Sequence, residues 1–155
     1  MILYSYMMPV ILKNIALLGF IGYLPFAPGT FATLFGVVFF AFLKPSFPVH
    51  FFLLAAVSVV GTVASGRTEK MLNEKDSSHI VINEFVGYAL SILSLPLTLP
   101  YLIAAFLLFR FFDILKPPPI RWIEKTLPGG AGIMADDLMA GIYANVLVQA
   151  WKALG

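Results

Sequence analysis

The sequence has 155 residues, of which 60% are hydrophobic and 12% are charged, and its mean hydropathy is +0.92. Because roughly 25% of residues are charged in an ordinary soluble domain, this composition is typical of an integral membrane protein. The net charge of +2 argues against nucleic acid as a partner, and the absence of cysteine excludes disulfides, thiolate metal sites and cysteine nucleophiles. No repeat or linker divides the chain, so we expect one membrane-embedded domain over residues 1–155.

The first apolar segment, residues 8–24, has no basic region before it and is a poor match to a cleaved signal peptide. It could cross the membrane, re-enter it or lie at its surface. Four later stretches contain no Asp, Glu, Lys or Arg: residues 31–43, 45–66, 85–109 and 138–151. Only the second and third reach the length of about 20 residues that a membrane-spanning helix needs.

The third stretch is interrupted by the sequence LPLTLP, in which Pro96 and Pro100 each remove a backbone donor and disfavour helix in the residue before them. We therefore predict a helical hairpin here. The expected fold is all-α, a small polytopic membrane bundle of five short helices near residues 31–43, 47–65, 80–95, 100–115 and 134–152. Several of these are too short to cross about 30 Å of hydrocarbon without local thinning or partial embedding.

Counting crossings with this hairpin places residues 24–30, 66–79 and 116–133 on one side of the membrane. That side carries six basic residues: Arg67, Lys70, Lys75, Lys116, Arg121 and Lys125. Lys44 and Lys152 fall on the opposite side. Since basic loops stay in the cytoplasm, the pattern predicts that the shared face is cytoplasmic.

Two isolated carboxylates lie in apolar sequence near the cytoplasmic ends of predicted helices. Asp113 is three residues from both Arg110 and Lys116, so a local salt bridge would explain it without any function. Glu84 has no basic residue within four positions. It therefore needs a distant partner or a cation, unless it lies at the membrane boundary and reaches water.

Asp136 and Asp137 stand together before the last apolar run. They could simply complement the positive end of a helix dipole, but one Asp is enough for that, and the second points about 100° away around the helix. Several carboxylates on one side of the membrane, in a chain with two His and no Cys, favour a hard cation such as Mg²⁺. Magnesium commonly accompanies phosphate.

Two glycine-containing segments at predicted helix starts, PFAPGTFAT and LPGGAGIM, offer backbone donors to such a phosphate, although similar segments are more often simple turns. Beyond the Asp pair, small side chains at Ala140, Gly141 and Ala144 form a stripe along one side of the helix. This stripe predicts close approach of a neighbouring helix.

The segments PFAPGT, HIVINEFVG, RFFDILKPPPI and GGAGIMADDLMAG together resemble the phosphatidylglycerophosphatase A family from about Gly19 to about Ala150. The resemblance implies a small helical membrane enzyme that requires Mg²⁺ and removes the terminal phosphate of phosphatidylglycerophosphate. The family usually has Asp where this chain has Asn83, so a neutral oxygen ligand is one interpretation of that position. The family's functional positions correspond to Thr30, Glu84, Arg110, Asp113, Lys116, Asp136 and Asp137.

From these positions we expect the carboxylates of Glu84, Asp113, Asp136 and Asp137 to bind the metal and take part in catalysis. Thr30, Arg110 and Lys116 are expected to bind the substrate phosphate. Direct attack by an activated water is the preferred mechanism, and an Asp nucleophile remains an alternative.

His79 is either an acid for the leaving group or a surface residue. Two other classes of function stay open, an intramembrane proton or ion conduit and a noncatalytic membrane assembly subunit. Polar residues clustered at one end favour the enzyme, since a conduit needs them through the full depth.

Overall fold

A computed structural model describes residues 2–154, and all regular structure within that range is helical. The elements are α1 (Ile2–Ala16), the short 3-10 turn η1 (Ile21–Tyr23), α2 (Pro28–Leu43), α3 (Phe47–Leu72), α4 (Ile82–Ser91), α5 (Leu99–Leu115), α6 (Ile120–Thr126) and α7 (Gly129–Leu154). The predicted all-α class is therefore confirmed.

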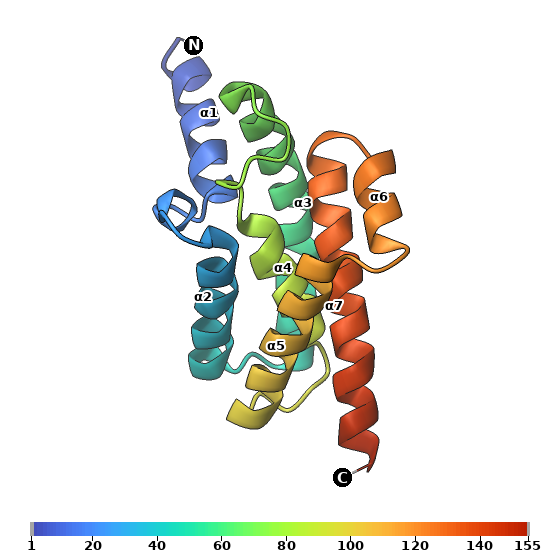
Figure 1. Cartoon of the computed structure of the whole chain (residues 1–155). Coiled ribbons are helices and arrows are strands. Elements are labelled where there is room, and N and C mark those ends of the chain that lie inside the picture. The colour runs from blue at the N-terminus through green and yellow to red at the C-terminus, as the bar shows by residue number, and fades with distance from the viewer. Residues whose placement is uncertain (1, 155) are drawn as a thin grey trace.

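Helix α4 lies at the centre of the bundle, with α2, α3, α5 and α7 around it (Figure 1). Its side chains are buried almost throughout, including Phe85 and Tyr88. Against α7 the two backbones nearly touch, because a Cβ added to Gly141 would lie 2.4 Å from the Gly87 carbonyl oxygen. Ala140 and Ala144 are also fully buried. The predicted small-residue stripe thus packs α7 onto the central helix.

The predicted hairpin is present, since α4 ends at Ser91 and α5 begins at Leu99. The intervening turn lies beside the last part of α7, where Asn145 Nδ2 donates to the Leu93 carbonyl at 2.9 Å. We call this the far end of the bundle, defined by residues 44–46 and 92–98. The opposite end, which we call the polar end, carries residues 73–81 and 116–128, so two of the three segments that the count of crossings placed on one side lie at the same end of the bundle (Figure 1).

The helices differ from the predicted five in their number and in several boundaries. Helix α3 continues to Leu72, because the residues after Gly66 are mostly good helix formers, and it ends where Asn73 adopts a φ of 51°. Helix α7 begins at Gly129, five residues earlier than expected. The short helix α6 was not predicted, and the apolar segment 8–24 divides into the second half of α1 and η1.

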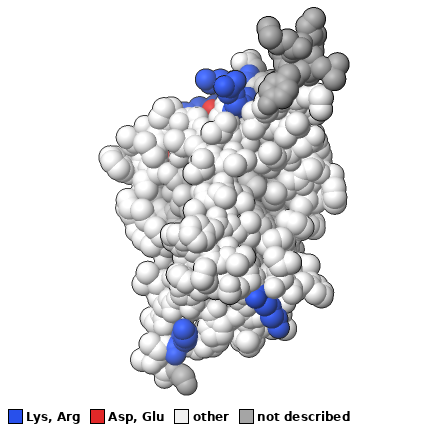
Figure 2. All heavy atoms as spheres, turned by 180° about the vertical axis from the view of Figure 1, so that it is seen from behind, with Lys and Arg blue, Asp and Glu red and all other residues white. Residues whose placement is uncertain are grey.

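Two helices, α3 and α7, are long and apolar enough to cross a membrane. In the most apolar window of each helix, 17% of α3 is buried inside the protein against 50% of α7, so α3 leaves most of its apolar surface exposed. The view from behind shows charged side chains gathered at the two ends of the molecule, with a broad uncharged band between them (Figure 2). Uncharged surface of this kind is typical of the part of a protein that lies in the hydrocarbon of a bilayer.

Candidate active site

Glu84 lies in the first turn of α4, directly against the start of α2. A Cβ added to Gly29 would lie 2.1 Å from Glu84 Oε1 and 3.3 Å from Arg110 Nη1, so only glycine allows this approach. The predicted PFAPGT segment is therefore beside the acidic residues. Thr30 follows in the same turn, and no hydrogen bond joins its hydroxyl to a carboxylate among the described residues.

On α5, Arg110 and Asp113 form the predicted local ion pair across one helical turn. Lys116 does not lie on the same side of the helix as this ion pair, because α5 ends before it and Lys116 adopts a left-handed φ of 46°. Its amine instead donates to Asp136 Oδ2 and to Glu124 Oε1, each at 2.7 Å. Burial disfavours the charged amine, but these two hydrogen bonds outweigh it and raise the pKa of Lys116.

The Asp pair lies two turns inside α7, which has no acidic residue in its first turn. The helix-start explanation of the pair is therefore wrong. Both side chains are buried and point in two directions, as predicted. Asp136 contacts Lys116, while Asp137 Oδ2 accepts a 2.6 Å hydrogen bond from Asn83 Nδ2 on α4.

Helices α4, α5 and α7 thus bring together what we call the carboxylate cluster, and its acidic members interact electrostatically across the helix boundaries. Its members are Asn83, Glu84, Arg110, Asp113, Lys116, Asp136 and Asp137. Sequence reasoning missed Glu124, which shares Lys116 with Asp136. It also missed the contact of Gly29 with Glu84. Neither residue has a local signal, because both contacts form only in the folded chain.

The carboxylate cluster contains three buried polar atoms without a hydrogen-bond partner: Asn83 Oδ1, Glu84 Oε2 and Arg110 Nε. Buried polar atoms are nearly always satisfied, so three exceptions in one place need an explanation. Two free oxygens suit a cation, and one free guanidinium nitrogen suits an anion.

The donor set fits Mg²⁺, which takes oxygen ligands, often only one or two from protein side chains, and keeps several waters. No ready-made group of three acidic or histidine ligands is found within residues 2–154. Asp113 and Asp136 form ion pairs with Arg110 and Lys116. Asn83 and Glu84 therefore offer the free oxygens. The wider ligand set of four carboxylates remains a prediction.

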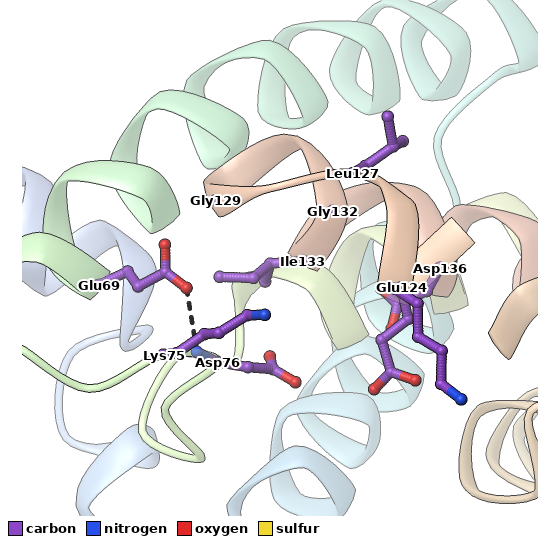
Figure 3. A pocket seen from close by; sticks show the side chains of 10 residues that line it. Glu69, Lys75, Asp76, Glu124, Leu127, Gly129, Gly132, Ile133 and Asp136 are labelled. Carbon is purple, nitrogen blue, oxygen red and sulfur yellow. Dashed lines mark hydrogen bonds between the residues drawn. The ribbon is translucent and has the colours of Figure 1, made fainter. Parts of the chain in front are cut away.

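A cavity of about 350 Å³ opens at the polar end and reaches Asp136 (Figure 3). Its walls include Glu69, Asp76 and Glu124, and Asp76 N donates to Glu69 Oε1 at 3.0 Å. Since one water occupies about 30 Å³ in the liquid, the cavity can hold several waters or a phosphate group next to the carboxylate cluster.

The two histidines make structural contacts. His79 Nδ1 lies 2.6 Å from the Gly22 carbonyl oxygen, which ties the α3–α4 connection to η1. His50 is buried near the far end, with Nε2 2.9 Å from the Ala89 carbonyl oxygen. The contact of His79 favours the structural interpretation of this residue over a role as leaving-group acid.

Comparison with known proteins gives a match to the family model described as phosphatidylglycerophosphatase A over residues 14–152. The chain belongs to the phosphatidylglycerophosphatase A family. It is 40% identical over 127 residues to the Haemophilus influenzae protein named phosphatidylglycerophosphatase A, covering 80% of this chain and 78% of that relative. The Escherichia coli protein of the same name is 33% identical over 126 residues, covering 79% and 73% of the two chains.

A third relative, from Bacteroides thetaiotaomicron, is named putative phosphatidylinositol-3-phosphatase and is 39% identical over 137 residues, covering 82% of this chain and 84% of that protein. No solved structure gives a significant match. Membership of the phosphatidylglycerophosphatase A family makes the chain a phosphatase. The enzyme interpretation is thereby confirmed over the ion conduit and the noncatalytic subunit.

Proposed function

We propose that this protein hydrolyses the terminal phosphomonoester of phosphatidylglycerophosphate to phosphatidylglycerol and phosphate, with Mg²⁺ as cofactor. The observation that supports this most strongly is the set of unpaired buried atoms in the carboxylate cluster of a phosphatase, Asn83 Oδ1, Glu84 Oε2 and Arg110 Nε. Together they offer ligands for a cation and for a phosphate oxygen within one site.

Asn83 and Glu84 would hold Mg²⁺, with Asp137 or Asp113 completing the ligand set. When bound, the ion supplies positive charge that offsets the negative charge of the phosphate. Arg110 binds a non-bridging phosphate oxygen through its free Nε, and Lys116 contributes a second positive charge from the α7 side. Thr30 offers a hydroxyl at the start of α2.

Asp137 Oδ1 is the oxygen that we assign as proton acceptor. Asp137 Oδ2 accepts from Asn83, and the two Asp136 oxygens accept from Lys116 and from the Asp137 amide. Water attacks phosphorus, its proton passes to Asp137, the ester P–O bond breaks, and the proton returns to the glycerol oxygen of the leaving lipid. Attack by an aspartate is the alternative, and trapping of an acyl-phosphate would distinguish the two.

We further propose that the bundle is an integral inner membrane protein whose polar end faces the cytoplasm. The uncharged band, the exposure of α3 and the basic residues of the polar end support this arrangement (Figure 2). Single cysteines at Ser78 and Thr126, both exposed, should be labelled from the same side, and one at Ser46 from the other side. Labelling of Ser78 and Thr126 from opposite sides would contradict the topology.

Phosphate release by the purified protein in mixed micelles tests the function. We expect turnover of phosphatidylglycerophosphate with Mg²⁺ and loss of turnover with a chelator. Phosphatidylinositol 3-phosphate is the competing substrate, because one relative carries a name with that specificity. A preference for it would replace the proposed substrate but keep the phosphatase site, whereas no release from either lipid would contradict the proposal.

A further inference from the structure

The polar end carries a second basic region, on α3 and away from the carboxylate cluster. Arg67 and Lys70 are one helical turn apart and both are exposed. Neither forms a salt bridge with any residue in the described part of the chain. The reaction outlined above uses neither of them, so their charges are available to another ligand.

These two cations line hollows on both sides of α3. Toward α1 lies a cavity of about 460 Å³, whose other walls are Met8, Pro9, Leu12 and Met71. Toward the start of α7 lies a cavity of about 340 Å³, lined by small or apolar residues that include Val63 and Gly66. Arg67 and Lys70 belong to both, so each hollow combines an apolar wall with the same pair of charges.

The depth of these residues matches a membrane surface. From Phe47 to Gly66, α3 has roughly 20 residues without Asp, Glu, Lys or Arg, which span about 30 Å, the thickness of the hydrocarbon layer. Arg67 is the first charge after this stretch. The side chains that precede it on α3, toward the middle of the bilayer, are exposed and apolar, since Val59, Val60 and Val63 are 67%, 44% and 51% exposed. A ligand held at Arg67 therefore has an apolar surface directly beneath it.

We propose that Arg67 and Lys70, with the α1–α3 groove, bind an anionic phospholipid at a site separate from the catalytic one. Its phosphate lies between the two cations at the groove, and its acyl chains lie along the valine face of α3. The charge of the headgroup complements two unpaired cations, and the length of the apolar face suits acyl chains. An acidic peptide would gain from the charges but not from the valines, and a second copy of the chain would bring the same charges against each other.

Lipid binding can be measured by native mass spectrometry of the protein in detergent with dioleoylphosphatidylserine, an anionic lipid that is not the product of the proposed reaction, or with dioleoylphosphatidylcholine. We expect the anionic lipid to bind more tightly, and Arg67→Gln with Lys70→Gln to weaken it by roughly tenfold or more. The matched control, Arg121→Gln with Lys152→Gln, removes the same charge from residues that line neither hollow, and it should retain binding. Turnover of micellar substrate should be unchanged in both variants.

Leu12→Trp fills the groove without changing any charge. It should also weaken binding of the anionic lipid and reduce its preference over phosphatidylcholine. Glycerol 3-phosphate, which has no acyl chains, should bind to none of the proteins. Lys70→Arg, which keeps the charge, should bind as the wild type does. The proposal is overturned if the charge-removing pair binds lipid as well as wild type does. It is also overturned if Leu12→Trp binds the anionic lipid as tightly as wild type does, because binding would then depend only on general electrostatic attraction to the surface. Protein dimers that occupy this face in place of lipid would overturn it too.

Discussion

The two ends of the bundle treat buried polar groups in opposite ways. Near the far end they are satisfied by backbone carbonyls: His50 Nε2 is 2.9 Å from Ala89 O, and Asn145 Nδ2 donates to Ser91 O at 3.0 Å and to Leu93 O at 2.9 Å. The His50 contact joins α3 to the last part of α4, and the Asn145 contacts hold the turn between α4 and α5. Every partner is already inside the protein, so nothing there calls for a ligand.

At the polar end, Asn83, Glu84 and Arg110 each keep one buried atom without a partner, although charged side chains surround them. An unsatisfied buried group costs free energy, and a fold that tolerates three in one cluster is stabilised when a ligand supplies the missing contacts. The difference between the two ends indicates where the functional site lies. Burial of polar groups alone does not mark the site, whereas unsatisfied atoms gathered among acidic and basic side chains do. The hydroxyls of Ser65 and Thr68 on α3 are also buried without a partner, so lack of a partner alone does not mark the site either.

The largest effect should come from the Asp pair. Asp136→Asn and Asp137→Asn keep the shape of each side chain and its place in α7, but they remove the charge and the proton acceptor. We expect phosphate release to fall roughly 100- to 10,000-fold in Asp137→Asn, with a smaller but clear loss in Asp136→Asn. Circular dichroism should show a folded protein. Near-native turnover in both variants would show that the Asp pair has only a structural role, like the polar groups of the far end.

Gly29→Ala tests whether α2 belongs to the site. The added methyl group would be placed 2.1 Å from Glu84 Oε1 and must displace that carboxylate. Because small displacements of catalytic groups are costly, turnover should fall by about 100-fold while the melting temperature changes little. Ala32→Gly on the same helix is a control for the change in helix propensity. Wild-type activity in Gly29→Ala would separate α2 from the reaction.

Asn145→Leu attacks the satisfied end. It removes the donor to the Ser91 and Leu93 carbonyls, and it should lower the free energy of unfolding by about 1–3 kcal/mol. Turnover per folded molecule should stay at the wild-type level, since the catalytic cluster is at the opposite end. Chemical denaturation in detergent and phosphate release at low temperature measure the two quantities. Loss of specific activity in the folded variant would show that the ends are not independent.

The smallest effect is expected from Asn83→Asp, which restores the residue usual in the family. It adds negative charge beside Asp137 and Glu84, so the metal-free protein should be slightly less stable, while Mg²⁺ should half-saturate activity at a concentration a few times lower. Titration of turnover with Mg²⁺ measures this. Weaker Mg²⁺ dependence in this variant would argue that position 83 does not face the ion.

The sequence predicts the hairpin and the close packing of α7 because local patterns control both. Pro96 and Pro100 disfavour helix wherever they occur, and the small stripe around Gly141 allows one kind of packing. The start of α7 was misplaced, because glycines at residues 129–132 are typical of loops, yet here they form the first turn of a helix.

The inner contacts of the site follow from tertiary structure and leave no local trace. Asn83 and Asp137 are 54 positions apart, and Lys116 reaches Asp136 across 20 positions. Asp113 has a basic residue three positions away on either side in sequence. Because α5 ends at Leu115, Asp113 pairs with Arg110, whereas Lys116 reaches Asp136 on α7. Sequence therefore identifies the candidate residues, and the fold determines their partners.

The most direct test of the account is the melting temperature in detergent against Mg²⁺ concentration, measured for wild type, Glu84→Gln and Asn145→Leu, with phosphate release on the same samples. We predict that Mg²⁺ stabilises wild type and Asn145→Leu by similar amounts. In Glu84→Gln the stabilisation should shrink and turnover should be almost lost, although the metal-free variant is as stable as wild type or slightly more so. A full Mg²⁺ response together with full activity in Glu84→Gln would contradict the assignment of this end of the bundle as the catalytic site.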